Sequence, residues 1–197
     1  MTTTTPQDVF ESDQTLWQSV RQGSESGFTA LFDRHHATLY NYGCKLSGNT
    51  SLVEDAVQDV FIDVWRLRKR LTPEVTSVKF YLFRSLRRRI HRAQLSVPAS
   101  QEISQTQEQG TLLTTRSSEF DLIAAETRQR LTGWLHSSVA QLPSRQAEVI
   151  SLRYFEEFTI PETARIMGVS EKSVRNFIYK ALCTLRETRP LLLFEEA

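Results

Sequence analysis

The residues with the clearest chemical potential are cations gathered in one stretch of the chain. Residues 66–92 carry ten lysines and arginines and one acidic residue, although the chain of 197 residues has a net charge of only +1. Positive charge concentrated on one element is typical of phosphate binding, because each neutralised phosphate releases a bound counterion. The pattern fits a polyanion as partner, and a solvated basic helix explains it equally well.

A second set of polar side chains lies where residues 159–185 have the spacing of a helix-turn-helix. Ala164 is small where two helices must cross closely, Gly168 permits a tight turn, and Ser170 can cap the helix that follows. The outer face of that helix offers groups that can hydrogen-bond base edges or phosphates in a major groove: Glu171, Lys172, Ser173, Arg175, Asn176, Tyr179 and Lys180. A helical hairpin with an ordinary wet face is the alternative.

The members of this outer face differ in what they can recognise. Arg175 and Asn176 are candidates for contacts with base edges, whereas Lys172 and Lys180 suit phosphates, because an ammonium acts as a point charge. The inner face of the same helix is expected to carry the apolar residues Val174, Ile178, Ala181, Leu182 and Leu185.

Histidines and a cysteine in the N-terminal half raise the question of a metal site. His35 falls on an apolar stripe while His36 points about 100° away from it, so the two cannot easily share one ion with Cys44 or His91. A packed histidine beside a surface histidine explains the pair better. The sequence predicts no metal, no cofactor and no catalytic residue.

Acidic residues recur at four-residue steps at Asp55, Asp59 and Asp63, within an N-terminal stretch, residues 1–65, that has nine acidic and three basic residues. Carboxylates at this spacing could hold a cation. An exposed acidic helix face for a basic partner is the interpretation we favour.

Three helices are expected to position the N-terminal residues. The first has apolar residues at three- and four-residue steps: Phe28, Leu31, Phe32, His35, Leu39, Tyr42 and Leu46. A capping box from Ser51 to Glu54 opens the second, which is expected to bury Val53, Ala56, Val57, Val60, Phe61, Val64 and Trp65. The third runs from about Val78 to Ala93, and it is expected to bury Leu82, Leu86 and Ile90 and to expose Arg84, Arg87, Arg88 and Arg92.

The C-terminal part is also expected to be helical. A helix from Leu122 to Val139 breaks at 142–144, and a second helix follows with Val149, Ile150, Leu152 and Tyr154. A capping box from Thr159 to Glu162 opens the helix-turn-helix, with a proline tolerated in the first turn.

The segment 94–119 is dominated by serine, threonine and glutamine without an apolar period, so it is interpreted as a linker. We therefore predict an all-α fold of two small helical domains, residues 1–93 and 120–197, joined by a flexible linker. No apolar run approaches the roughly 20 residues that span a bilayer, and the N-terminus lacks the pattern of a secretory signal. We expect a cytoplasmic protein without membrane insertion, in which Cys44 and Cys183 stay reduced.

These features together resemble the extracytoplasmic-function (ECF) sigma factors of the sigma-70 family, over roughly residues 25–94 and 122–188. In that family a helix of the form Asp-x-x-Gln-acidic-x-Phe-x-x-x-Trp binds core RNA polymerase, and the matching residues are Asp55, Gln58, Asp59, Phe61 and Trp65. The basic helix resembles the segment that recognises and melts the minus-10 element, which implies contacts by Lys79, Phe80, Tyr81, Arg84, Arg87, Arg88 and His91. Residues 142–155 and the helix-turn-helix resemble the region that recognises the minus-35 element.

The chain departs from the family pattern at three positions. Tyr81 stands where the family commonly has tryptophan, Arg88 where it has asparagine, and Phe177 where many members have arginine. The promoter sequence therefore cannot be copied from a relative.

The resemblance implies a non-enzymatic factor whose partners are core RNA polymerase, promoter DNA and an anti-sigma factor. The alternative is a helix-turn-helix transcriptional regulator that acts without core polymerase, with an N-terminal sensor or dimerisation domain. A sensor usually shows alternating strands and helices, and residues 1–93 show no such alternation.

Overall fold

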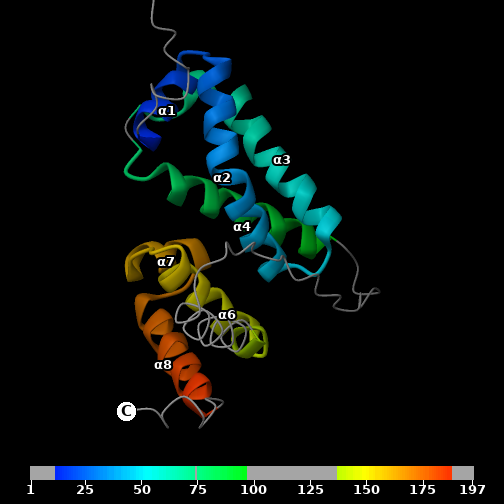
Figure 1. The fold of residues 1–197 in the computed structure, drawn as a ribbon, viewed down its shortest axis with the longest axis vertical. Coiled ribbons are helices and arrows are strands. Elements are labelled where there is room, and N and C mark those ends of the chain that lie inside the picture. The colour runs from blue at the N-terminus through cyan, green and yellow to red at the C-terminus, as the bar shows by residue number, and fades with distance from the viewer. Residues whose placement is uncertain (1–11, 74, 97–136, 188–197) are drawn as a thin grey trace, which may run out of the picture. The chain divides into compact units, whose positions relative to one another are not determined.

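The computed structural model describes residues 12–73, 75–96 and 137–187. The described residues form helices and connecting turns, with no strand among them. They divide into two units, one built on α1 to α4 and one that contains α6 and α8 (Figure 1). The predicted all-α fold with two helical domains is confirmed. The predicted linker lies outside the described residues, except that 94–96 belong to the end of α4.

The first unit comprises α1 (Asp13–Arg21), α2 (Glu25–Leu46), α3 (Thr50–Arg66), the short 3-10 helix η2 (Arg68–Arg70) and α4 (Val78–Ser96). The three helices predicted in this part of the chain are α2, α3 and α4. Helix α2 contacts α1, α3 and α4, and Figure 1 shows α2 and α3 running side by side with α4 crossing them. The apolar face of each helix is therefore buried against the others, which stabilises the unit by roughly 1.5–3 kcal/mol for each large side chain.

Gly43 permits the close approach of α2 to α3. A Cβ atom at this position would lie 2.5 Å from Cγ1 of Val53, which is far inside van der Waals contact. The missing side chain lets the two helices pack tightly, and this packing fixes the direction of α3.

Helix α1 was not predicted. The Ser12 side chain accepts a hydrogen bond from the Thr15 N–H (3.2 Å), and the helix buries Leu16, Trp17 and Val20 completely. The Trp17 indole N–H donates to the carbonyl oxygen of Thr72 (3.1 Å). With only nine residues, α1 is too short to show a sustained apolar period or to be stable alone.

The start of α3 differs from the prediction. Asn49 is the N-cap residue, and its side chain accepts a hydrogen bond from the Leu52 N–H (3.1 Å). The predicted capping box from Ser51 to Glu54 is wrong, because Ser51 already lies within the helix. Asparagine is as good an N-cap as serine, so the earlier of two competent residues starts the helix.

Several side chains differ from their expected burial. Trp65 is half-buried, because at the end of α3 it turns towards Phe28 (ring centroids 5.1 Å apart). Phe83 is fully buried beside Tyr42, although the apolar stripe predicted for α4 did not include it. Leu182 remains 37% exposed.

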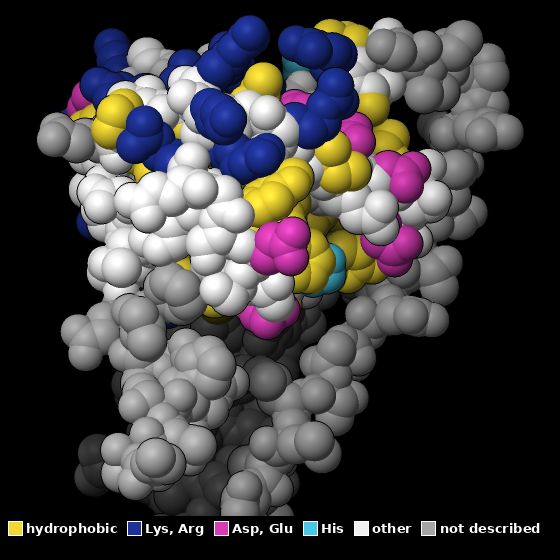
Figure 2. Space-filling model, turned by 90° about the horizontal axis from the view of Figure 1, so that it is seen from above, with side chains coloured by type: hydrophobic (Ala, Val, Ile, Leu, Met, Phe, Trp, Pro, Cys, Tyr) yellow, Lys and Arg dark blue, Asp and Glu magenta, His cyan; other side chains and the backbone are white. Residues whose placement is uncertain are grey.

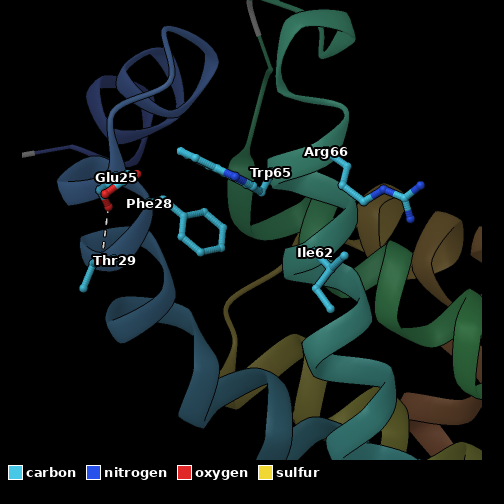
Figure 3. Close-up of a pocket in the computed structure, with 6 residues that line it drawn as sticks. All are labelled: Glu25, Phe28, Thr29, Ile62, Trp65 and Arg66. Atoms are coloured by element: carbon cyan, nitrogen blue, oxygen red, sulfur yellow. Dashed lines mark hydrogen bonds between the residues drawn. The ribbon is translucent and has the colours of Figure 1, made fainter.

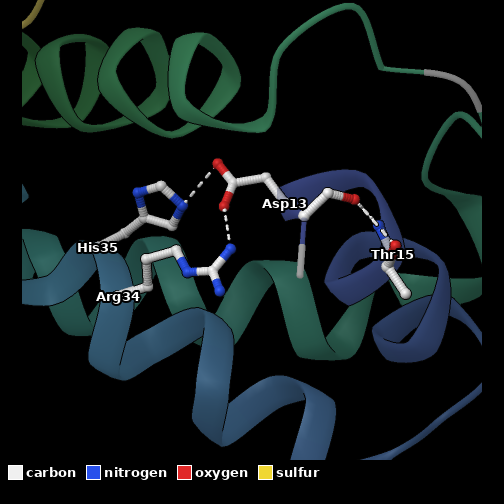
Figure 4. A network of polar contacts seen from close by, with 5 residues as sticks. Asp13, Thr15, Arg34 and His35 are labelled. Carbon is white, nitrogen blue, oxygen red and sulfur yellow. Dashed lines mark hydrogen bonds and ion pairs between the residues drawn. The ribbon is translucent and has the colours of Figure 1, made fainter. Parts of the chain in front are cut away.

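A polar cluster links α1 to α2. Asp13 Oδ1 lies 2.9 Å from Arg34 Nη1, and Asp13 Oδ2 lies 3.0 Å from His35 Nε2 (Figure 4). Burial lowers the pKa of His35, and the opposing influence of the Asp13 carboxylate is smaller. His35 is thus a neutral, packed residue, as the sequence suggested.

The second unit contains α6 (Ser144–Ile150), the π-helix η3 (Ser151–Phe155) and α8 (Glu171–Glu187), and α7 (Ile160–Met167) lies between η3 and α8 in the chain. The predicted second helix is α6 continued by η3, in which Tyr154 is 55% exposed instead of buried. Of the helix predicted from Leu122 to Val139, residues 122–136 lie outside the described residues, and 137–140 are helical.

The connections of the helix-turn-helix match the prediction. The Thr159 N–H donates to the Glu162 carboxylate (2.9 Å), and the Glu162 N–H donates to the Thr159 hydroxyl (3.4 Å), which completes the capping box. Gly168 has a φ of +66° in the turn, and the Ser173 N–H donates to the Ser170 hydroxyl (3.1 Å).

Glu157 is a non-glycine residue with a φ of 60°, in the turn between η3 and α7. This backbone conformation costs an L-residue with a side chain roughly 1–2 kcal/mol. Glu157→Gly should therefore raise the free energy of unfolding by about 1 kcal/mol, measured by urea denaturation. Glu156→Gly is the control: Glu156 has a φ of −101°, so the change should destabilise instead. An unchanged midpoint for Glu157→Gly would mean that the Glu157 side chain offsets the strain.

Candidate functional site

The outer side of α3 exposes polar and apolar residues along one line. Asp55, Gln58 and Asp59 are exposed, and Ile62 (48% exposed) and Arg66 continue the line by one further turn each. We call these five residues the α3 face. Ile62 and Arg66 were missed by the sequence analysis, although an isoleucine outside the buried stripe of an amphipathic helix is itself a signal of a contact surface.

A shallow pocket of about 350 Å³ adjoins the α3 face. Its walls come from the start of α2 and the end of α3, and Figure 3 shows the side chains that line it: Glu25, Phe28, Thr29, Ile62, Trp65 and Arg66. Most of the pocket surface is apolar, with one acidic and one basic residue among the lining residues. Such a hollow can receive an apolar side chain from a partner.

The two aromatic residues predicted on this surface differ in their positions. Phe61 is 2% exposed and packs against Phe32, with the ring centroids 4.8 Å apart, so it anchors α3 in the core. Trp65 lies at the pocket, where the guanidinium of Arg68 is 4.5 Å from its ring centroid. Only Trp65 of the two can touch a partner without rearrangement.

The outer side of α4 carries the exposed basic residues of this helix. Arg84, Arg88, His91 and Arg92 are exposed, at spacings of three and four residues that place the first three on one side of the helix. We call these four residues the α4 face. Figure 2 shows lysine and arginine side chains crowded over one part of the surface of this unit. Arg87 is half-buried.

The other residues predicted at the minus-10 element, in the first turn of α4, are half-buried. The ammonium of Lys79 is 5.8 Å from the Phe83 ring centroid, and the Lys79 side chain is half-buried. Tyr81 packs edge-on against Trp17 (ring centroids 5.2 Å apart), and burial raises the pKa of its hydroxyl. Phe80 is half-buried in the first turn.

Arg89 is the one arginine of the run 87–89 that the sequence analysis did not single out. Its Nη1 lies 2.8 Å from Oδ2 of Asp59, and its Nη2 pairs with Oδ2 of Asp63. The guanidinium thus joins α4 to α3. The helical period of α4 could not reveal this link. The link depends on which helix packs beside Arg89, and that is a property of the tertiary structure.

The outer side of α8 is the third candidate surface. Its exposed residues are Lys172, Arg175, Asn176, Tyr179 and Lys180, with Tyr179 69% exposed. We call these five residues the α8 face. Arg175 Nη2 lies 3.2 Å from Oε2 of Glu171, which is also exposed at the edge of the face. Ser173 is half-buried and its hydroxyl is 2.9 Å from that of Ser170, so it belongs to the cap of the helix.

The described residues bring no group of three or more histidine, cysteine, aspartate or glutamate side chains together as ligands for a metal ion. No helix in the described ranges is long and apolar enough to cross a membrane.

Two family models match the chain. The model of sigma-70 region 2 matches residues 31–95, which cover most of α2 and all of α3, and the model of sigma-70 region 4 matches residues 132–185. The α3 and α4 faces lie within the first match, and the α8 face lies within the second.

Relatives and solved structures agree with these matches. The ECF RNA polymerase sigma factor SigL of Mycobacterium tuberculosis is 25% identical over 159 residues, which cover 81% of this chain and 86% of SigL. The structure of CnrH in complex with the cytosolic domain of CnrY has a TM-score of 0.57 at 22% identity, covering 89% of this chain and 95% of the matched chain. The Bartonella quintana sigma factor RpoE, solved in complex with the anti-sigma factor NepR, has a TM-score of 0.55 at 19% identity, with 82% and 95% covered. The two structural matches show a shared fold.

Proposed function

Since the chain belongs to the extracytoplasmic-function sigma factors of the sigma-70 family, which direct RNA polymerase to promoters, we propose that its three exposed faces divide this task. The α3 face docks on core RNA polymerase, the α4 face contacts the minus-10 element, and the α8 face recognises the minus-35 element. The proposed domains are residues 1–96, ending with α4, and 120–197, with the segment between them as linker.

The observation that carries this proposal is that the first unit exposes acidic and apolar residues on one helix and arginines on another. Helix α3 exposes Asp55, Gln58 and Asp59 beside an apolar pocket, whereas α4 exposes arginines. An acidic and apolar surface would repel phosphates and suits a protein partner, while an arginine surface attracts the DNA backbone. One small domain can therefore hold polymerase and DNA at the same time without the two sites competing.

Docking on core polymerase can be tested at Gln58 and Asp59, which lie side by side at the centre of the α3 face. Gln58→Ala combined with Asp59→Ala should weaken the affinity for core polymerase at least about tenfold, because a hydrogen bond to a charged group contributes roughly 1.5–3 kcal/mol. Both side chains are exposed, so the variant should fold normally. Fluorescence anisotropy of labelled protein with core polymerase measures the affinity.

Glu54→Ala is the control, because it removes an exposed carboxylate that lies one turn before Gln58 and outside the five residues of the α3 face. It should leave the affinity unchanged. A folded double variant that binds core polymerase as tightly as the wild type would refute the docking assignment.

Melting of the minus-10 element requires bases to unstack, at a cost of a few kcal/mol for each step. We propose that phosphate contacts by Arg84 and Arg88 offset this cost. Base stacking on Tyr81 would require the ring to leave its contact with Trp17, so Phe80 is the better placed of the two aromatic residues. We retain Arg87 and His91 as further contacts and regard Lys79 as the weakest of the predicted set.

An anti-sigma factor is part of the proposal. The solved RpoE is held by the anti-sigma factor NepR, and this chain has the same fold over 82% of its length. The pocket beside the α3 face offers such a partner a site that would exclude polymerase.

Sigma factors are non-enzymatic initiation factors, and we propose that this chain likewise catalyses no reaction and works in the cytoplasm, where polymerase meets the chromosome. A helix-turn-helix regulator that acts without polymerase is not favoured. Such a protein would not require a domain that matches sigma-70 region 2, and this chain has one.

A further inference from the structure

We propose that Arg89 is a positioning residue for polymerase docking: it holds the Asp59 carboxylate of the α3 face in place and does not contact DNA. The inference rests on the proposed docking role of the α3 face. It assigns a separate task to one member of the run 87–89, whose sequence alone suggests a uniform DNA-binding surface.

The Arg89 guanidinium bridges two carboxylates of α3. One arm of the guanidinium reaches Asp59 Oδ2 at 2.8 Å, and the other arm pairs with Asp63 Oδ2, one helical turn further along α3. The Arg89 side chain is 32% exposed, against 56% for Asp59 and 44% for Asp63. A planar guanidinium with donors in fixed directions suits two acceptors at this spacing.

The charge balance around Arg89 argues against a DNA contact. Two carboxylates surround its single positive charge, so the group of three has a net negative charge that repels phosphates. Arg84 and Arg88, in contrast, are exposed and form no ion pair with any residue that the structure describes. A phosphate would bind those two before it displaced either aspartate.

The same link prepares Asp59 for a partner. Arg89 occupies Oδ2 only, and a carboxylate can accept about four hydrogen bonds, so Oδ1 stays available. A side chain that is already fixed loses less conformational freedom when the partner binds. Removal of Arg89 also makes the face more acidic, but at 0.15 M salt the Debye length is about 8 Å, so the added long-range attraction is small.

The test compares Arg89→Met with its neighbour Arg88→Met, since methionine keeps the length of the side chain and a good helix propensity. Arg89→Met should weaken the affinity for core polymerase about three- to tenfold, as expected when one side chain must be immobilised on binding. Arg88→Met should leave that affinity unchanged. Arg89→Lys, which can reach one aspartate at a time, should give an intermediate affinity.

Two further measurements separate positioning from general destabilisation and from DNA binding. In an Asp59→Asn background, Arg89→Met should cause little further loss, because the residue that it positions is already altered. The protein is kept in saturating excess over core polymerase, and the logarithm of the promoter affinity is plotted against the logarithm of the salt concentration. The magnitude of the slope should fall by about one for Arg88→Met and stay unchanged for Arg89→Met.

The proposal is overturned if Arg89→Met binds core polymerase like the wild type, or lowers the salt slope by about one, or causes the same loss in the Asp59→Asn background. These failures are distinguishable from failure of the proposed docking site. In that case Asp59→Asn itself would leave the affinity for core polymerase unchanged, whatever Arg89→Met does.

Discussion

Arg84→Ala combined with Arg88→Ala should reduce open-complex formation about 100-fold and lower the slope of promoter binding against log salt by about two. The two side chains lie one turn apart on the exposed side of α4 and form no ion pair among the described residues. Each is therefore free to bind a phosphate, and each such contact releases about one counterion. Losing two charge-assisted contacts at roughly 1.5 kcal/mol each accounts for the expected loss.

Permanganate reactivity of unpaired thymines measures the melted promoter, and filter binding at several salt concentrations gives the slope. Lys79→Ala serves as control, because its ammonium lies against Phe83 on another side of α4. The control should change the slope by much less than one. If the double variant keeps the wild-type slope and reactivity, the α4 face does not contact the DNA backbone.

On the α8 face, Arg175→Ala and Asn176→Ala should each change the preferred minus-35 sequence. Arginine binds guanine and asparagine binds adenine through two hydrogen bonds, and the loss of one such pair costs about 1–3 kcal/mol on the cognate site. Both residues are exposed on the first two turns of the helix that follows Gly168. The partner of Arg175 in the free protein, Glu171, is itself exposed and gives up the contact at little cost.

A selection on randomised minus-35 DNA measures the preferred sequence for each variant. Lys172→Ala and Lys180→Ala are matched controls from the same face, and they should weaken binding to all sequences alike, since phosphate contacts carry no base information. If Arg175→Ala and Asn176→Ala also weaken binding uniformly and leave the preferred sequence unchanged, those two residues contact only the backbone.

The faces of the long helices could be predicted from the sequence, because the helical period depends on residue order alone. The exposed side of α3 carries Asp55, Gln58 and Asp59 as expected, and the exposed side of α8 carries every expected residue except the half-buried Ser173. Local hydrogen bonds were equally predictable where one cap was available, as at Thr159 and Ser170. At α3 two competent caps lie close together, and the capping-box pattern predicted the later one, whereas Asn49 caps the helix.

Contacts between helices could not be predicted in the same way. Arg89 looks like its neighbours in the sequence, and only the position of α3 beside α4 gives it two aspartates as partners. Tyr81 similarly lies against Trp17 of α1, a helix too short to be recognised. For Ile62 only half of the result could be predicted. Its exposure follows from the helical period of α3, but the pocket beside it is formed together with residues of α2.

The packing of α1 also constrains how the protein can fold during synthesis. This helix leaves the ribosome well before α4, yet its Trp17 is held by the Thr72 carbonyl and the Tyr81 ring. At about 5–20 residues per second, several seconds pass before those partners emerge. Until then Trp17 lacks these two contacts, although α1 can already pack against α2. The packing of α1 is therefore completed only after the start of α4 has been translated.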